Sequence, residues 1–186
     1  LAEIVMETDL PRSAYSVLPA KSSLAENAVK DPRFRKLTFT GSAPIGWYLK
    51  GLDPKKKVTL ELGGNAGVIV HSDADLDWAA KRCAFGGYYQ AGQSCISVQR
   101  ILVQSEVYDD FLLRYKKEVE ALKTGDPLDP TVDVGPVIDP GELDRIDAWV
   151  KEAAENGADV ILGGERVGDS CYAPTIITQT KGTDNV

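Results

Sequence analysis

The sequence predicts an α/β fold with mainly parallel strands. Segments with the short apolar pattern of strands alternate with segments whose apolar residues recur at helical spacing, as expected when helices connect parallel strands. Glycine follows several strand-like segments, where tight strand-to-helix turns favour it. The 186 residues are 43% hydrophobic, so the chain can bury the core that this fold needs.

The two ends of the sequence resemble interrupted elements. Residues 1–11 carry Leu1, Ile4 and Val5 on one stripe, which indicates the later part of an amphipathic helix. The last residues, "KGTDNV", contain no closing element. We therefore expect this chain to be a segment of a longer protein.

The next elements follow a strand-helix-strand-helix order. Residues 14–20 predict a short apolar strand, 22–29 a helix and 35–41 a second strand. Pro44 then opens a helix that reaches at least Leu49, because proline is favoured in a first helical turn.

The middle of the chain continues this alternation. Residues 57–71 hold two strand-like runs split by a glycine pair, and residues 73–89 begin with acidic residues that favour a helix N-terminus. Residues 100–104 predict a strand. Residues 106–125 predict an amphipathic helix that ends at a glycine.

The remaining elements follow a loop rich in proline and aspartate at residues 126–139. Residues 140–157 predict a helix, and residues 158–164 and 173–180 predict two more strands.

Composition and charge limit the function classes. The formal charge of −7 disfavours a nucleic-acid or anionic-membrane partner, since both require clustered Lys and Arg. No apolar run approaches the roughly 20 residues of a membrane-spanning helix. The three cysteines lack ligand or disulfide spacing, so we expect no metal site and a reducing, cytoplasmic location.

Cys95 is the candidate for chemistry among the cysteines. It lies in "AGQSC", at a turn between a predicted helix and a predicted strand, where backbone N–H groups can stabilise a thiolate. Cys83 lies mid-helix among apolar residues and is expected to be buried. Cys171 lies in a Gly/Asp/Ser-rich loop and is expected to be incidental.

Two further segments can carry polar chemistry. In "LTFTGSAPIG", a strand runs through Gly41 and Ser42 into a helix, with Gly46 further along, so backbone N–H groups there can face a phosphate. Glycine is also common at any such turn. In "LELGGN", Glu61 lies within an apolar strand, which is costly unless the carboxylate is ion-paired, exposed to a cleft or used.

A family resemblance rests on six short motifs in order. The motifs "FTGS" (39–42), "LELGG" (60–64), "DADLD" (73–77), "AGQSC" (91–95), "GDP" (125–127) and "GPVI" (135–138) resemble those of the NAD(P)-dependent aldehyde dehydrogenase superfamily. The resemblance implies an aldehyde-dehydrogenase-like catalytic domain at residues 63–186, preceded at 1–62 by the end of a Rossmann-type cofactor domain.

The same resemblance implies roles for individual residues. Cys95 is the expected nucleophile and Glu61 the general base that activates water for thioester hydrolysis. Gly41, Ser42 and Gly46 are expected beside the pyrophosphate of NAD or NADP, and Leu62 and Gly63 beside the nicotinamide. A small aldehyde substrate and a homo-oligomer are also implied.

Several other residues are expected to be structural. His71 is expected at the surface or as a cap, and Tyr88 and Tyr89 in the core in preference to a substrate tunnel. Ser97 is considered as a neighbour of the substrate. Core positions on apolar helix stripes are expected for three tryptophans, Trp47, Trp78 and Trp149.

Two other functions remain open from the residues. A cysteine-dependent ester or thioester hydrolase would use Cys95 and Glu61 without a nicotinamide, and a non-catalytic oligomerisation module would need neither residue. An ester-hydrolysis assay with and without cofactor discriminates between the aldehyde dehydrogenase and the cysteine hydrolase.

The first testable prediction concerns the 186-residue chain taken alone. The resemblance places the family's oxyanion-hole asparagine and adenine-binding residues outside this sequence, and loss of one oxyanion donor costs on the order of 10²–10³ in rate. We therefore expect negligible NAD-dependent turnover and no NAD affinity at micromolar concentrations. Calorimetric titration tests this, and tight NAD binding by the chain would contradict it.

Overall fold

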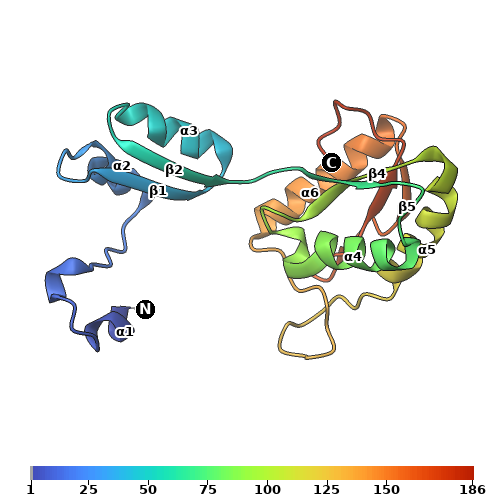
Figure 1. The fold of residues 1–186 in the computed structure, drawn as a ribbon, viewed down its shortest axis with the longest axis horizontal. Helices are drawn as coiled ribbons and strands as arrows, with labels where there is room; N and C mark the ends of the chain where they lie inside the picture. The colour runs from blue at the N-terminus through green and yellow to red at the C-terminus, as the bar shows by residue number, and fades with distance from the viewer. Residues whose placement is uncertain (1) are drawn as a thin grey trace. The chain divides into compact units, whose positions relative to one another are not determined.

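The computed structural model describes residues 2–186 and divides into two compact units. The first unit ends at Gly63 and the second begins at Gly64 (Figure 1). Leu1, which the sequence places on the first helical stripe, lies outside the described residues.

The first unit is built on one pair of parallel strands. The pair consists of β1 and β2, and α3 is the helix that connects them, as the alternation of patterns predicts. The elements in order are α1 (Ala2–Met6), the 3₁₀ turn η1 (Arg12–Ala14), α2 (Ser22–Lys30), β1 (Lys36–Gly41), α3 (Ala43–Leu52) and β2 (Lys57–Leu62).

The strand expected at residues 14–20 is absent from the described structure, and that prediction was wrong. Residues 15–21 have no regular structure, and Leu18 is 80% exposed. An apolar run becomes a strand only when a neighbour pairs with its backbone groups. In the part of the chain that is described, β1 pairs with β2 alone, and Pro19 could not donate to a ladder.

The second unit combines parallel and antiparallel pairs. β3 and β4 are parallel and α4 connects them, whereas β5 with β8 and β6 with β7 form shorter antiparallel pairs. The elements are β3 (Ala66–Val70), α4 (Leu76–Tyr88), η2 (Tyr89–Gly92), β4 (Val98–Val103), η3 (Ser105–Val107), α5 (Tyr108–Glu120), α6 (Pro140–Glu155), β5 (Asp159–Leu162), β6 (Arg166–Val167), β7 (Cys171–Tyr172) and β8 (Ile176–Thr178). The structure confirms the α/β class.

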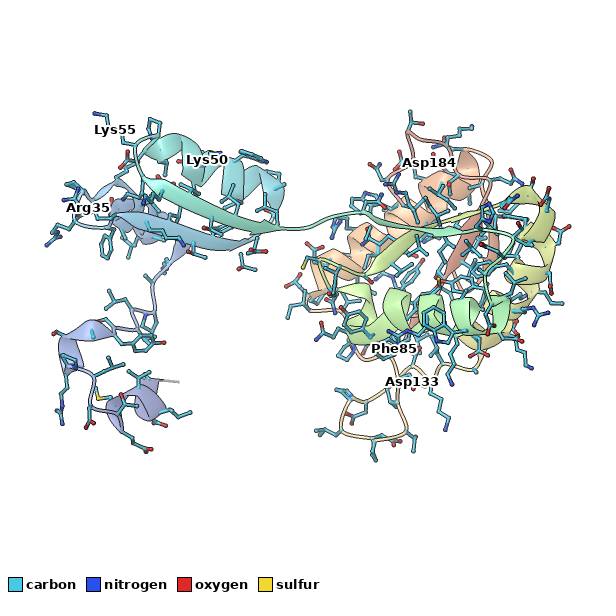
Figure 2. The ribbon with its side chains drawn as sticks, viewed as in Figure 1. Arg35, Lys50, Lys55, Phe85, Asp133 and Asp184 are labelled. Carbon is cyan, nitrogen blue, oxygen red and sulfur yellow. The ribbon has the colours of Figure 1, made fainter. Side chains whose placement is uncertain are left out.

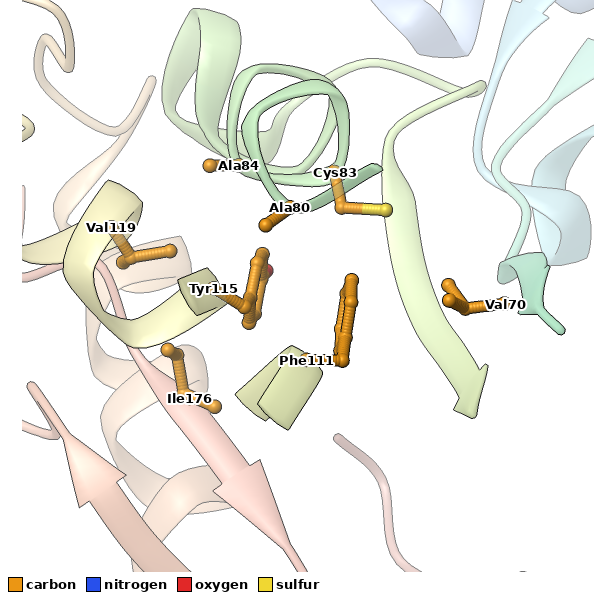
Figure 3. Packing of buried hydrophobic residues seen from close by; sticks show 8 residues of the cluster. All are labelled: Val70, Ala80, Cys83, Ala84, Phe111, Tyr115, Val119 and Ile176. Carbon is orange, nitrogen blue, oxygen red and sulfur yellow. The ribbon is translucent and has the colours of Figure 1, made fainter. Parts of the chain in front are cut away.

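The main core of the second unit lies between α4, α5 and the strands. Phe111 and Tyr115 of α5 stack with ring centroids 5.7 Å apart and meet Ala80 and Cys83 of α4 (Figure 3). The eight buried residues of this cluster, which we call the α4–α5 core, are Val70, Ala80, Cys83, Ala84, Phe111, Tyr115, Val119 and Ile176.

A second, smaller cluster lies beneath α6. Leu143 and Val150 of α6 pack with Tyr172 of β7 and with Val137 from the loop that precedes α6. That loop closes on itself at Asp133, labelled in Figure 2, whose backbone N–H donates to the Lys123 carbonyl. We call the four buried residues Val137, Leu143, Val150 and Tyr172 the α6 cluster.

Two tryptophans and one cysteine lie in surroundings that differ from those predicted. Trp47 is 58% exposed and Trp78 65% exposed, so neither is a core residue, while Trp149 is half-buried. Cys171, expected in a loop as an incidental residue, is buried in β7. Helical spacing identifies an apolar stripe but does not identify what covers it, which explains the error for both exposed tryptophans.

The second testable prediction compares two glycines of the second unit. Both have positive φ, +69° at Gly163 and +63° at Gly168, so alanine at either position costs about 1–2 kcal/mol. A Cβ at Gly163 would also overlap the Pro174 carbonyl and lie 2.7 Å from Thr175 Oγ1, whereas one at Gly168 meets nothing within 4 Å. Urea denaturation should therefore show Gly163→Ala to be less stable than Gly168→Ala by roughly 1–3 kcal/mol. Equal stabilities would show that the turn after β5 is not packed as described.

Candidate functional site

Cys95 lies at an exposed turn between the 3₁₀ turn η2 and the strand β4. Helix α4 ends at Tyr88, and β4 begins at Val98, so nine residues reverse the chain from helix to strand, counted as 97 − 88. The sequence-based prediction of an exposed turn cysteine is confirmed in position.

The backbone before Cys95 is left-handed at three successive residues. The φ angles are +52° at Gln90, +55° at Ala91 and +71° at Gly92. Only glycine adopts this region without cost, so the first two residues are held there by surrounding contacts. This reversal turns the chain back toward β4 and leaves Cys95 outside the packed helix.

Ser97 fastens the end of the turn to the end of α4. Its side chain is 1% exposed, and its hydroxyl lies 3.1 Å from the Gly86 carbonyl oxygen and 3.0 Å from that of Gly87. These carbonyls belong to the last turn of a helix, where intrahelical partners are missing. Ser97 is therefore a buried structural residue, and its place as a neighbour of the substrate stays a prediction.

Two neighbouring tyrosines at the end of α4 point in different directions. Tyr88 points inward and donates to the Thr175 carbonyl at 2.7 Å, and its burial raises the pKa of its phenol far above the usual value. Tyr89 donates to Ser94 Oγ at 2.5 Å and stacks on Phe85, with ring centroids 5.5 Å apart. Tyr89 thus contacts the residue directly before Cys95.

Two backbone features bear on the chemistry of Cys95. A Cβ at Gly64 would lie 3.2 Å from the Cys95 carbonyl oxygen, so a side chain there would press on the turn. Within residues 2–186, no group accepts a hydrogen bond from the Cys95 backbone N–H. That N–H can therefore donate to an oxyanion formed on a carbonyl that the thiol attacks.

The other two thiols lie in packed surroundings. Burial raises the pKa of the Cys83 thiol, which keeps it protonated and unreactive. Cys171 is also buried. Exposure therefore distinguishes Cys95 from both of the other cysteines.

Glu61 lies in the first unit, on an exposed position of β2 opposite Thr40 of β1. The next residue, Leu62, packs on the helix side, because a Cβ at Gly46 of α3 would meet Leu62 Cδ2 at 2.6 Å. Side chains alternate along a strand, so Glu61 points to the face opposite α3. Within residues 2–63 it has no ion pair, so the structure gives no support to a structural ion pair for this carboxylate.

The Gly41–Ser42 turn leads directly into α3. Ser42 is the N-cap residue, and its hydroxyl makes no capping hydrogen bond. Gly46 is buried and allows α3 to approach Phe39 and Leu62 closely. The free N–H groups at the start of α3 suit an anion, while Gly46 itself serves packing.

The predicted site residues divide between the two units. Cys95 belongs to the second unit, whereas Glu61 and the residues expected beside the cofactor, Gly41, Ser42, Gly46, Leu62 and Gly63, belong to the first. Each unit therefore carries one part of the predicted chemistry.

The described part of the chain has neither a metal-binding cluster of side chains nor a helix that could cross a membrane. Residues 2–186 contain no cluster of three His, Cys, Asp or Glu side chains arranged to hold a metal ion. No helix within that range has the length and apolarity to span a bilayer. The exposed His71 bonds to Asp73 at 2.9 Å, as a surface residue.

One surface hollow lies away from Cys95. It has a volume of about 600 Å³ and is lined by α4 and α5, including Asp77, Asp110 and Arg114. Arg114 bridges the two carboxylates at 2.5 Å and 2.9 Å, so the charges there satisfy one another. We take this hollow to be a salt-bridged helix surface, not the site of chemistry.

Comparison with known proteins identifies the family. The model of the aldehyde dehydrogenase family matches residues 1–186, which is the whole chain. The chain belongs to the aldehyde dehydrogenase family. This agrees with the resemblance carried by the six sequence motifs.

Relatives within the aldehyde dehydrogenase family are considerably longer. The chain is 41% identical over 179 residues to 3-sulfolactaldehyde dehydrogenase from Priestia aryabhattai, covering 96% of this chain and 37% of that protein. It therefore spans just over a third of the length of that curated relative.

Solved aldehyde dehydrogenase structures share the fold. An NAD-dependent aldehyde dehydrogenase from Sinorhizobium meliloti matches with a TM-score of 0.94 and 34% identity, over 99% of this chain and 38% of that chain. Aldehyde dehydrogenase 21 from Physcomitrella patens, solved with the reaction product succinate, matches with a TM-score of 0.93 and 40% identity, over 98% and 38%.

Sequence reasoning missed the residues that hold the turn of this aldehyde dehydrogenase chain. Gly64 and Gln93 both lie inside quoted motifs, yet neither was given a supporting role at Cys95. Their partners are backbone groups distant in sequence or in the turn itself, and a motif does not name such partners.

The third testable prediction concerns Ser97→Ala. The substitution leaves two carbonyls at the end of α4 without the buried hydroxyl, which should cost about 1–3 kcal/mol in the free energy of unfolding. Exposed Ser170 provides the control, since Ser170→Ala should change stability by less than about 0.5 kcal/mol. Chemical denaturation measures both, and a neutral Ser97→Ala would show that Ser97 does not fasten the turn.

Proposed function

We propose that this chain is the catalytic segment of an NAD(P)-dependent aldehyde dehydrogenase that oxidises an aldehyde to a carboxylate. The observation that carries the proposal is an exposed Cys95 with a free backbone N–H, in a chain of this family. The domain assignment proposed with it is the end of a cofactor domain at 1–62 and a catalytic domain at 63–186.

Cys95 begins the reaction as the nucleophile. Its thiolate sulfur forms a bond to the aldehyde carbon, and the carbonyl electron pair moves to oxygen to give a tetrahedral thiohemiacetal. The Cys95 N–H donates to that oxyanion. When the oxyanion re-forms the carbonyl, the hydride leaves and a thioester remains on Cys95.

Gly41 and Ser42, at the uncapped start of α3, would hold the cofactor's pyrophosphate, and Gly46 would keep α3 close enough to the strands for this. Leu62 and Gly63 would lie beside the nicotinamide. The bound nicotinamide supplies the hydride acceptor. Either NAD or NADP would suit this turn, because the residues named would contact only the parts that the two cofactors share.

Glu61 completes the reaction as the general base. Its carboxylate accepts a proton from water, which attacks the thioester carbon; the carbon–sulfur bond breaks and Cys95 leaves as thiolate. An exposed carboxylate on the strand face opposite α3 is free for this role. The product is a carboxylic acid.

Short aldehydes that carry an anionic group are the first substrates to test. The similar Priestia protein is named for 3-sulfolactaldehyde, and the similar Physcomitrella structure holds succinate as product. We extend both to this chain as candidate substrates, 3-sulfolactaldehyde and succinate semialdehyde. The full proposal is that the protein acts on a small aldehyde, is located in the cytoplasm and assembles as a homo-oligomer.

The fourth testable prediction separates the two catalytic roles in the whole protein that the gene encodes. Cys95→Ala should remove aldehyde oxidation, because no bond to the substrate can form. Glu61→Gln should retain a rapid burst of about one NADH per site and then turn over at least tenfold more slowly, because hydrolysis loses its base, a contribution of typically 10²–10⁴. Stopped-flow absorbance measures both phases.

The control is His71→Ala, at a surface residue with no role in this mechanism, which should retain full turnover. Full steady turnover by Glu61→Gln would place the base elsewhere. Ester hydrolysis by the wild type that is indifferent to NAD, without aldehyde oxidation, would favour the cysteine hydrolase instead.

A further inference from the structure

We propose that Gln93 is a positioning residue that holds the Cys95 turn against the segment at residues 136–138. This inference rests on the proposed role of Cys95 as nucleophile and adds a residue to which the mechanism above gives no part. The side chain of Gln93 makes three hydrogen bonds, and each is to backbone.

The three bonds form a bridge across the chain. Gln93 Nε2 donates to the Gln90 carbonyl at 3.0 Å and to the Pro136 carbonyl at 3.3 Å, and its Oε1 accepts from the Ile138 N–H at 2.8 Å. An amide side chain carries both donor and acceptor, which this arrangement requires. One side chain therefore joins the left-handed turn to a segment more than 40 residues away in sequence.

The segment at the far side of the bridge is itself fixed. Val137 is 8% exposed and belongs to the α6 cluster, and its N–H donates to the Ser170 carbonyl at 2.8 Å. Gln93 therefore forms hydrogen bonds to the backbone on both sides of Val137, in a segment that is itself held in place. The turn gains support that its own residues cannot provide.

The near side of the bridge is the strained part of the turn. Gln90 has a φ of +52°, and the Gln93 side chain bonds to its carbonyl while the Gln93 backbone N–H bonds to the same carbonyl at 3.1 Å. A non-glycine residue remains left-handed only where its surroundings hold it. Gln93 supplies two of those contacts, two residues before Cys95.

Two anchors therefore fix the turn from opposite directions. Ser97 ties the end of the turn to α4, which belongs to the α4–α5 core, and Gln93 ties its start to the α6 cluster. Cys95 lies between these two anchors and makes neither bond. The sulfur and the N–H are thus held in place while remaining free to react, and small displacements of a reacting group reduce rate strongly.

The test measures alkylation of each cysteine in the 186-residue chain by iodoacetamide, resolved by peptide mass spectrometry. Gln93→Met keeps the length of the side chain and loses all three bonds. We expect Cys95 to react about three- to tenfold more slowly, because the loss of these hydrogen bonds releases the turn that holds its sulfur in place. Gln99→Met, the same change at an exposed position of β4, should leave the rate unchanged.

A second pair of variants tests the partner. Ile138 is 84% exposed, so Ile138→Ala should leave the alkylation rate unchanged. Ile138→Pro removes the backbone N–H that donates a hydrogen bond to Gln93 Oε1. The double variant Gln93→Met/Ile138→Pro should be no slower than Gln93→Met alone, because Gln93→Met already loses the bond that Ile138→Pro removes. Continued protection of Cys83 and Cys171 shows that the fold persists.

A kinetic readout in the whole encoded protein distinguishes positioning from general stability. Gln93→Met should lower kcat for aldehyde oxidation by about the same factor as alkylation, with the KM for cofactor unchanged. A rise in that KM with unchanged kcat would overturn the inference.

Two outcomes of the alkylation test separate the inference from the proposed function. If wild-type Cys95 reacts faster than a cysteine in an unstructured peptide but Gln93→Met reacts equally fast or faster, the nucleophile stands and the role of Gln93 is refuted. If wild-type Cys95 reacts no faster than the peptide, the nucleophile and its positioning residue are refuted together.

Discussion

The structure around Cys95 depends on one constraint: the exposed thiol that we propose as the nucleophile must be held by a packed domain without being packed into it. Left-handed backbone at Gln90 and Ala91 turns the chain away from the helix and places Cys95 at the surface. Such a turn would relax if left to itself. Hydrogen bonds from Ser97 and Gln93 to backbone carbonyls hold the turn. Because these flanking residues stabilise it, the Cys95 sulfur and N–H remain free.

The first unit satisfies a related constraint by strand alternation. Leu62 packs toward α3, where Gly46 makes room for it, so the preceding Glu61 points to the opposite face. The start of α3 follows the end of β1 directly, through Gly41 and Ser42. Strand alternation thus directs the carboxylate proposed as base, and the chain connection from β1 to α3 forms the turn proposed for phosphate.

The sequence predicted the elements whose signal is local. Alternating patterns located both parallel pairs and their connecting helices, and the motif around Cys95 identified an exposed turn. Prediction from the sequence failed where the structure of a segment depends on which other segment pairs with it or covers it. Residues 14–20 have the apolar pattern of a strand but no partner within the described residues, and the stripe that includes Trp78 has no cover there. The bridge from Gln93 to Pro136 and Ile138 was beyond reach because no periodicity relates residues 43 and 45 apart.

The central claim is that Cys95 becomes acylated by the substrate while Glu61 releases the product. The most direct measurement is intact and peptide mass spectrometry of Glu61→Gln, in the whole encoded protein, quenched in acid after mixing with NAD and a candidate aldehyde. The account predicts one acyl group per chain, two hydrogen masses below the aldehyde adduct and attached to the peptide that contains Cys95. Label on any other residue, or no acyl group under conditions in which NADH is formed, would contradict it.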